Sequence, residues 1–455
     1  MSEGTALSSF EVHDKEALAK ARNLMSSTES PKAWADEVLE AVKRNEEWRG
    51  KRCLNMLAPE APTSPTVRAL LSSEIGTRAA EGHIGRVNRW FAGTQHIDEV
   101  EALCVELLKT AFRCRYADHR LMGSMLGNLA VYHALVEPGD TVMTASQPFG
   151  GHSSNRHDGP AGTRGLNIVD IPYDPEKLEV DLVAFTKLAR EVRPKLVVMG
   201  MSMTLFPLPV REMSKIIAEW DAKFIFDGAH QAGLIAGGQF QDPLNEGAVI
   251  LTGSAGKTFS GPQSGMIMWN DPALTEPLTE AIFPVLVATH QVNRVAALAV
   301  ATAEMIEFGP VYMAQIVKNS QALGKALDVR GIPMLGTEKG YSQTHQVIAN
   351  VKQFGGGLEV AHRLAEANLI TNKNLIPGDG PEDWDRPSGL RIGTIEITRL
   401  GMNEVDMSTI ADFIARVLVE GESTKSVGKD VVDFRLPKQD FYYCFDNGWP
   451  AWVKR

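Results

Sequence analysis

The chain has 455 residues, a formal net charge of −10 at pH 7, 44% hydrophobic residues and 22% charged residues. This length accommodates a large α/β domain with a smaller domain appended, and the composition is that of a globular protein. The acidic balance excludes a general nucleic-acid binder, because no basic stripe is present to neutralise phosphates.

The cysteines, the N-terminus and the apolar runs favour a cytoplasmic protein. Cys53, Cys104, Cys114 and Cys444 have the spacing neither of metal ligands nor of a disulfide framework, so we expect a reducing compartment and no metal. The first 16 residues lack the cationic start and apolar stretch of a signal peptide. The most apolar run, VAALAVATAEMIEFG, carries two glutamates, so we expect no membrane-spanning segment.

Helical and apolar stretches follow each other in a regular order. Residues 14–48 predict one or two polar helices, which we interpret as part of an N-terminal arm over residues 1–60. From residue 98 onward, amphipathic helical stretches alternate with short apolar runs such as TVMTAS, KLVVMGM, KFIFD and GAVILT. This alternation predicts an α/β domain over residues 61–330, with a mostly parallel sheet covered by helices on both faces.

The C-terminal third has a different pattern. A helical region from 292 to 330 is followed by the strand patterns THQVIANV and GLRIGT and the helix pattern LEVAHRLAEANL. These elements predict a smaller α+β domain over residues 331–425. Residues 426–455 are rich in aromatic side chains, and we expect this tail to pack against the body or a partner subunit.

Three side chains fall where a parallel sheet binds its ligands, beyond the carboxyl ends of the strands. Asp227 ends KFIFD, Ser202 follows KLVVMGM, and Lys257 lies among small residues in SAGKTFSG, shortly after GAVILT. Asp227, His230 and Lys257 form one set, because His230 follows Asp227 by three residues. Considered singly, Asp227 could be a helix cap, His230 a core histidine and Lys257 a surface lysine. Taken together they suit pyridoxal phosphate, which needs a lysine to form a Schiff base and a carboxylate to keep its ring nitrogen protonated.

The segment FIFDGAHQAGLIAGGQF, followed by LTGSAGKTFSGPQSGMI, resembles serine hydroxymethyltransferase, a fold-type I pyridoxal-phosphate family. It is also similar to that family's relatives, the threonine aldolases and threonine transaldolases. The resemblance extends from about residue 54 to 419, through LAPEAPTSPTV, AAEGHIG, GGH, GMSMT, TNKNLIP and SGLRIGT. It implies a pyridoxal 5'-phosphate enzyme that acts on a small amino acid and an aldehyde, as a homodimer with shared sites.

By position, the resemblance implies a role for each of five residues around the cofactor ring. Lys257 would bind the cofactor covalently, and Asp227 would pair with its pyridine nitrogen. His230 would lie near the phenolic oxygen, His152 in FGGH would stack on the ring, and Ser202 would touch its polar edge.

Phosphate and substrate contacts are implied in the same way. Ser124 would bind the phosphate together with the backbone of Gly123, and Gly261 would approach it from the partner subunit. Arg391 in LRIGT would clamp the substrate carboxylate, a task that suits a bidentate guanidinium. Glu60 in LAPEA would transfer protons near the β-hydroxyl of the substrate.

Several positions depart from the family pattern. Gly256 stands where the family usually has histidine, Ser260 and Gln263 replace two arginines, and the substrate-site tyrosine pair is Trp90–Phe91. The lost phenols favour chemistry without folate, whereas TNKNLIP keeps asparagines that folate-using members also have. The two signals leave the use of folate open.

With Arg391 on the carboxylate and Glu60 near the β-hydroxyl, the bond best served is Cα–Cβ. We therefore expect folate-independent aldol or retro-aldol chemistry on a β-hydroxy-α-amino acid. The alternatives are another pyridoxal-phosphate reaction (decarboxylation, racemisation or O₂-dependent oxidation), a folate-dependent serine or α-methylserine hydroxymethyltransferase, and an inactive homologue that serves as a binding subunit.

Overall fold

The computed structural model describes residues 14–28 and 30–445. The internal contacts divide the chain into two units, Met1–Cys53 and Leu54–Arg455. The described part of the first unit consists of the helices α1 (Lys15–Ser27) and α2 (Pro31–Asn45) and the π-helical turn η1 (Glu46–Arg52). None of these three elements contains a buried residue, so they form no core of their own.

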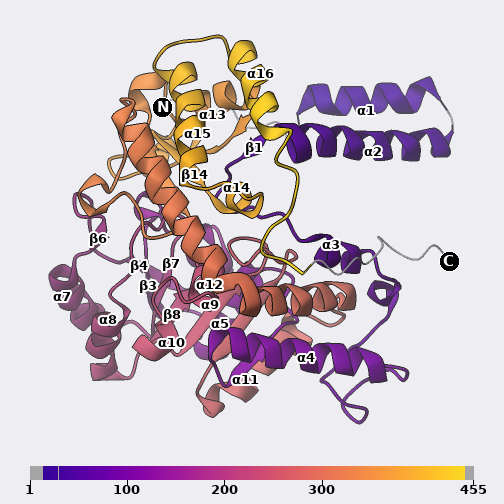
Figure 1. Cartoon of the computed structure of the whole chain (residues 1–455). Coiled ribbons are helices and arrows are strands. Elements are labelled where there is room, and N and C mark those ends of the chain that lie inside the picture. The colour runs from indigo at the N-terminus through magenta and orange to yellow at the C-terminus, as the bar shows by residue number, and fades with distance from the viewer. Residues whose placement is uncertain (1–13, 29, 446–455) are drawn as a thin grey trace. The chain divides into compact units, whose positions relative to one another are not determined.

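A seven-stranded sheet forms the centre of the second unit (Figure 1). In spatial order its strands are β2 (Tyr116–Asp118), β10 (Gly265–Trp269), β9 (Ile250–Ser254), β8 (Lys223–Asp227), β7 (Leu196–Gly200), β3 (Thr141–Thr144) and β4 (Asn167–Asp170). The strands from β9 to β4 pair in parallel, which confirms the mostly parallel sheet. β10 is antiparallel to both neighbours, because residues 255–264 are too short for a crossover of about a dozen residues or more.

Helices cover both faces of this sheet, as the sequence predicts. Along β7, Val197 and Met199 belong to one hydrophobic core, and Leu196 and Val198 belong to another. The first core receives side chains from α4 (Gln95–Phe112), α7 (Leu182–Val192), α8 (Val210–Ile217) and α12 (Val292–Val329). The second receives them from α5 (Ser124–Leu135) and α11 (Thr275–Glu280). Two buried faces explain why the strands read as continuous apolar runs.

The C-terminal part has a separate three-stranded antiparallel sheet, with β14 (Gly389–Gly393) between β11 (Gln346–Asn350) and β13 (Asn372–Asn374). Around it lie α13 (Gly357–Glu366), α15 (Glu404–Leu418) and α16 (Thr424–Arg435), with a core of their own. β1 (Leu54–Asn55) pairs in parallel with β12 (Leu369–Ile370). Residues 54 and 55 therefore join this part, although the sequence placed them in the arm.

The long helix α12 connects the two parts of the second unit. It contacts α4 and α9 (Ala232–Ala236) beside the large sheet, and α15 and β11 beside the small one (Figure 1). By length and composition alone α12 could cross a membrane, but 61% of its most apolar window is buried inside the molecule. That burial is typical of a core helix. Of the aromatic tail, Tyr443 stacks on Tyr312 of α12, and residues 446–455 lie outside the described residues.

Candidate active site

Lys257 lies in the loop between β9 and β10, and this loop has little room for larger side chains. A Cβ atom at Gly256 would meet the side chain of Gln263 at 2.7 Å. Ser260 has a φ of 57°, in the left-handed region, and its N–H donates to the carbonyl of Lys257. The loop is therefore a tight turn that presents one long side chain.

The amine of Lys257 lines a cavity and has no hydrogen bond or ion pair to any residue that the structure describes. Burial lowers the pKa of this lysine to about 8. Asp227 opposes this shift and Arg391 adds to it. An amine with this pKa is partly neutral near pH 7.5, and the neutral form is the nucleophile that attacks a carbonyl carbon.

Asp227 ends β8 and is 4% exposed. Its carboxylate accepts hydrogen bonds from Asn128 Nδ2 at 2.7 Å, from Asn155 Nδ2 at 3.2 Å and from the N–H of Ala229 at 3.2 Å. Asn128 is held in turn by Thr252, which donates to its amide oxygen at 2.9 Å. A buried carboxylate with three donors is fixed in position and can face a cationic group.

His152 is connected to the same network. Its Nδ1 lies 2.8 Å from Ser154 Oγ, and Asn128 Nδ2 donates to that hydroxyl at 2.9 Å. Burial lowers the pKa of His152, with Asp227 opposing the shift and Lys257 and Arg391 adding to it. The imidazole is therefore neutral near pH 7 and has a fixed orientation.

A second polar cluster contains His230, which lines the same cavity as Lys257. His230 Nδ1 and His345 Nε2 are 3.3 Å apart, and Gln346 Nε2 lies 3.2 Å from the first and 3.1 Å from the second. Burial lowers the pKa of His230, and it lowers that of His345 to about 3. The amide of Gln346 also donates to the carbonyl of Ser202 at 3.0 Å. Both histidines are therefore neutral, and Gln346 joins them to the cavity wall.

Arg391 reaches the cavity from β14 of the small sheet. Its Nη1 donates to the carbonyl of Ser202 at 2.7 Å and its Nε donates to Asn372 Oδ1 at 3.2 Å. It is 7% exposed, and burial lowers its pKa to about 10, so the guanidinium is still charged at neutral pH. Two fixed bonds orient the group and leave N–H donors for a ligand.

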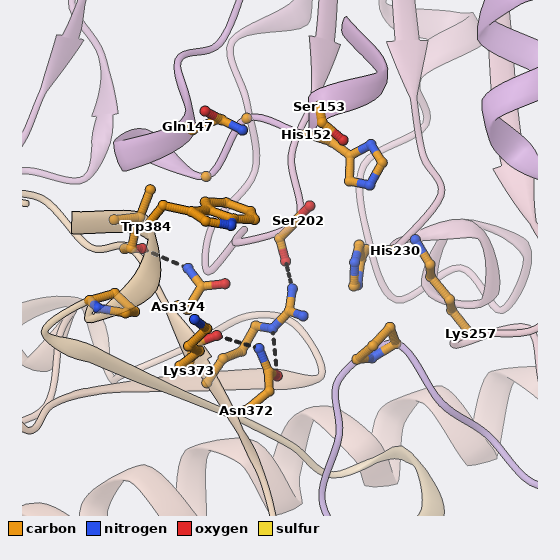
Figure 2. Close-up of a pocket in the computed structure, with 16 residues that line it drawn as sticks. Gln147, His152, Ser153, Ser202, His230, Lys257, Asn372, Lys373, Asn374 and Trp384 are labelled. Carbon is orange, nitrogen blue, oxygen red and sulfur yellow. Dashed lines mark hydrogen bonds between the residues drawn. The ribbon is translucent and has the colours of Figure 1, made fainter. Parts of the chain in front are cut away.

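These side chains share one cavity of about 540 Å³ (Figure 2). Its wall contains five residues that the sequence predicts for the site, namely Lys257, His152, Ser202, His230 and Arg391. Trp384 and Gln147, which the sequence analysis did not single out, also line it, together with Asn372 and Asn374. Figure 2 shows the Trp384 indole beside Asn374, across the cavity from Lys257.

Seven other predicted residues are absent from the wall of this cavity, as far as the described residues define it: Gly123, Ser124, Asp227, Gly261, Glu60, Trp90 and Phe91. Gly123 and Ser124 begin α5, whose first turn has no side-chain cap. Glu60 follows Pro59, which does line the cavity. Trp90 and Phe91 are 76% and 46% exposed. Their predicted roles stay predictions.

The residues present fit pyridoxal phosphate by the chemistry of their donor set. The cavity presents an amine without a partner among the residues that the structure describes, and a buried, fully bonded carboxylate lies behind its wall at the end of β8. Such a pair matches the aldehyde and the ring nitrogen of this cofactor. The Arg391 guanidinium, which lines the same cavity, supplies a partner for a carboxylate.

The sequence did not predict several residues of this site. Asn128 lies in the segment GSMLGN, and His345 and Gln346 lie in SQTHQV, but neither segment by itself shows which residue bonds to which. Asn155 and Trp384 belong to no motif, and only the three-dimensional structure brings them to the site.

Comparisons with known proteins agree with the geometry of this site. A family model described as "Serine hydroxymethyltransferase" matches residues 32–414. A serine hydroxymethyltransferase of Methanocella arvoryzae is 45% identical over 397 residues, which is 87% of this chain and 93% of that protein. One of Pyrococcus furiosus is 43% identical over 424 residues, which is 92% of this chain and 99% of that protein.

Among solved structures, the L-threonine transaldolase from Pseudomonas fluorescens in its internal aldimine state has a TM-score of 0.84. It is 26% identical to this chain, and the match covers 93% of this chain and 97% of the other.

Proposed function

Because the chain belongs to the serine hydroxymethyltransferase family of pyridoxal-phosphate-dependent transferases, we propose that it binds pyridoxal 5'-phosphate and breaks and forms the Cα–Cβ bond of a β-hydroxy-α-amino acid. One observation carries this proposal. The reactive amine of Lys257 and the oriented guanidinium of Arg391 line the same cavity. We further propose that the reaction needs no folate and that the acceptor is an aldehyde.

Five residues would hold the cofactor. Lys257 would bind it covalently, Asp227 would pair with its ring nitrogen, and His152, Ser202 and His230 would surround it. When bound, the cofactor withdraws electrons from Cα and so stabilises negative charge there. The network from Asn128 to Asp227 supports this, because it keeps the carboxylate in place for a protonated nitrogen.

Arg391 would hold the substrate by its carboxylate. The bonds to Ser202 and Asn372 fix the plane of the guanidinium, so a bidentate carboxylate can take only a narrow range of orientations. With its carboxylate held by Arg391 and its amino group held by the cofactor, the substrate could not rotate freely about Cα. Such positioning selects which bond at Cα breaks.

Cleavage also requires a group that accepts the proton of the β-hydroxyl. His152 lines the cavity and is neutral, so it can accept a proton near pH 7. Lys257 is partly neutral in the same range. We assign the proton transfer first to these two groups, with Glu60 as the residue that the family resemblance adds.

The proposal of folate independence rests on lost hydrogen bonds. Trp90 and Phe91 replace two tyrosines of the family pattern, which removes two hydroxyl partners but keeps two aromatic rings. A polar ligand group left unpaired in a buried site costs about 1–3 kcal/mol, or roughly tenfold or more in affinity for each group. The similarity to an L-threonine transaldolase supports an aldehyde acceptor.

The test is a product assay with L-threonine and L-serine, each with and without tetrahydrofolate. We expect aldehyde release from L-threonine at a rate that tetrahydrofolate does not change, and slower cleavage of L-serine. Adding a second aldehyde should yield a new β-hydroxy-α-amino acid. A strong tetrahydrofolate requirement with L-serine as the best substrate would contradict the proposal.

Folate-dependent hydroxymethyl transfer is the second candidate. The relatives from Methanocella arvoryzae and Pyrococcus furiosus carry the name serine hydroxymethyltransferase. In addition, Asn372 and Asn374, which belong to the asparagine motif shared with folate-using members, both line the cavity. The tetrahydrofolate arm of the assay separates the two candidates.

A further inference from the structure

A buried cluster of potential metal ligands lies outside the cavity described above. Glu101 lies on α4, His119 directly follows β2, and His290 immediately precedes the start of α12. These side chains are 1%, 3% and 2% exposed. One ligand atom from each residue lies within 4.8 Å of the other two. From these residues, we propose that the chain binds a zinc ion at Glu101, His119 and His290.

His119 is the observation that points to a ligand. Neither of its ring nitrogens has a hydrogen-bond partner among the described residues, although the ring is buried. Its Nε2 lies 3.5 Å from Glu101 Oε2, which is too long for an ordinary hydrogen bond. A buried imidazole without partners destabilises the fold unless something binds it. A metal ion uses the lone pair that is free here.

The spacing of the ligand atoms suits zinc. Tetrahedral zinc with bonds of about 2.0–2.1 Å places its ligand atoms about 3.3 Å from one another. One ligand atom from each of the three residues lies within 4.8 Å of the other two, so short side-chain movements bring them to this spacing. His290 Nε2 and Glu101 Oε1 instead share a hydrogen bond. Zinc would take the place of the proton on His290 Nε2, which moves to Nδ1 of the same ring, so the Nε2 and Oε1 atoms separate.

Arginine side chains hold the carboxylates around the cluster. Arg89 Nη2 lies 2.7 Å from Glu101 Oε2 and 2.7 Å from Asp98 Oδ1. Arg120 pairs with Asp118 at 2.6 Å. A third guanidinium, that of Arg294, donates to the backbone carbonyl of Arg120 at 3.1 Å, so three positive groups balance the three carboxylates. Arg89 holds one carboxylate oxygen of Glu101, as a partner behind a metal ligand does, and Oε1 is the oxygen left for zinc.

A second cavity gives access to the cluster. It has a volume of about 270 Å³, and Glu101, His119 and His83 line it. The cavity supplies an entry path and space for a water molecule as the fourth ligand, with the His83 imidazole on its wall. The ion would join α4, the segment after β2 and the segment before α12. Residues 120–123, which lead into the predicted phosphate-binding turn of α5, follow His119 directly.

The test measures zinc bound to the full-length, untagged protein with its cofactor. The protein is dialysed against a chelator, incubated with Zn²⁺, desalted and analysed by elemental mass spectrometry, alongside His119→Gln and His290→Gln. We expect one zinc ion per chain in the unaltered protein. Because changes behind a metal ligand already cost about 10- to 100-fold in affinity, losing a ligand should cost at least about 100-fold.

Matched controls are His96→Gln and His133→Gln, whose side chains are exposed and should leave zinc binding unchanged. Folding of each variant is checked by retained cofactor absorbance. If both His119→Gln and His290→Gln fail to fold, Co²⁺ binding to the unaltered protein decides, because tetrahedral Co²⁺ has intense visible bands. No zinc retained by the unaltered protein, equal zinc in His119→Gln, or octahedral-type Co²⁺ bands would overturn the proposal.

Discussion

At the scale of single residues, two charged neighbours act on the Lys257 amine in opposite directions. Burial lowers its pKa to about 8, the negative charge of Asp227 opposes that shift, and the positive charge of Arg391 adds to it. Near pH 7.5 about a quarter of such an amine is neutral, compared with about one in a thousand for an ordinary lysine. The neutral form reacts with an aldehyde, so its fraction controls how fast the cofactor binds.

Cofactor binding to the apoprotein should therefore depend on pH in a direction that each neighbour sets. The rate should rise with pH through a midpoint near pH 8, where half of the Lys257 amine is neutral, and level off about one pH unit higher. Arg391→Gln removes a positive neighbour, so the pKa of Lys257 and the midpoint of the curve should rise. Asp227→Asn removes a negative neighbour, so both should fall. Stopped-flow absorbance measures the curves, and midpoints that move together in the two variants would contradict this account.

Covalent attachment gives the matching chemical test. Borohydride reduction of the loaded protein should fix the pyridoxyl group on Lys257, because its amine lines the cavity and is partly neutral. Peptide mapping locates the label. Lys373 is the built-in control, since it also lines the cavity but donates to the carbonyl of Asp385. A label on Lys373 or any other lysine would refute the assignment of Lys257.

At the scale of elements, the loop between β9 and β10 contains two departures from the family pattern that depend on each other. Gly256 stands where the family usually has histidine, and Gln263 stands where it has arginine. A Cβ at Gly256 would meet the Cδ, Nε2 and Oε1 atoms of Gln263 at 2.7 Å each. The side chain of Gln263 therefore occupies the space next to residue 256.

This contact predicts a non-additive pair of substitutions. Gly256→Ala should lower the free energy of unfolding by about 1–3 kcal/mol, because overpacking displaces Gln263. In the presence of Gln263→Ala the same change should cost at least about 0.5–1 kcal/mol less, since the clash is gone. Denaturant unfolding of the four proteins measures the coupling. A Gly256→Ala cost that Gln263→Ala leaves unchanged would show that the two residues do not compete for space.

The sequence predicted elements where one physical signal dominates. Continuous apolar runs identified β3, β7, β8 and β9, because both faces of these strands are buried. The short strands β2 and β13 were missed, since three residues carry too little pattern. Site residues, too, were predicted only where the local sequence carries a clear pattern. Lys257, Asp227 and Arg391 stand in local motifs, whereas Asn155 and Trp384 reach the site only through tertiary packing.

At the scale of the whole molecule, a single chain leaves large apolar side chains exposed near residues predicted to bind the cofactor. Val87, Trp90 and Phe91 are 92%, 76% and 46% exposed. Met122 and Met125, on either side of the predicted phosphate residues Gly123 and Ser124, are 48% and 44% exposed. Contiguous exposed apolar surface is typical of protein–protein contacts. We propose that a second copy of the chain covers these groups and completes each site.

Mixing two inactive variants tests this shared site. One variant is Lys257→Ala, which keeps Trp90 and Phe91, and the other carries Trp90→Ala and Phe91→Ala but keeps Lys257. In a two-fold dimer with shared sites, equal mixing makes half of the dimers mixed, and each mixed dimer has one intact site. Activity should therefore return to about one quarter of that of the unaltered protein. If Trp90 and Phe91 serve the site of their own chain, no mixed dimer has an intact site and no activity returns. Light scattering of the mixture verifies that dimers are present. If light scattering of the unaltered protein instead shows a monomer with full activity, the proposal of a shared site is refuted.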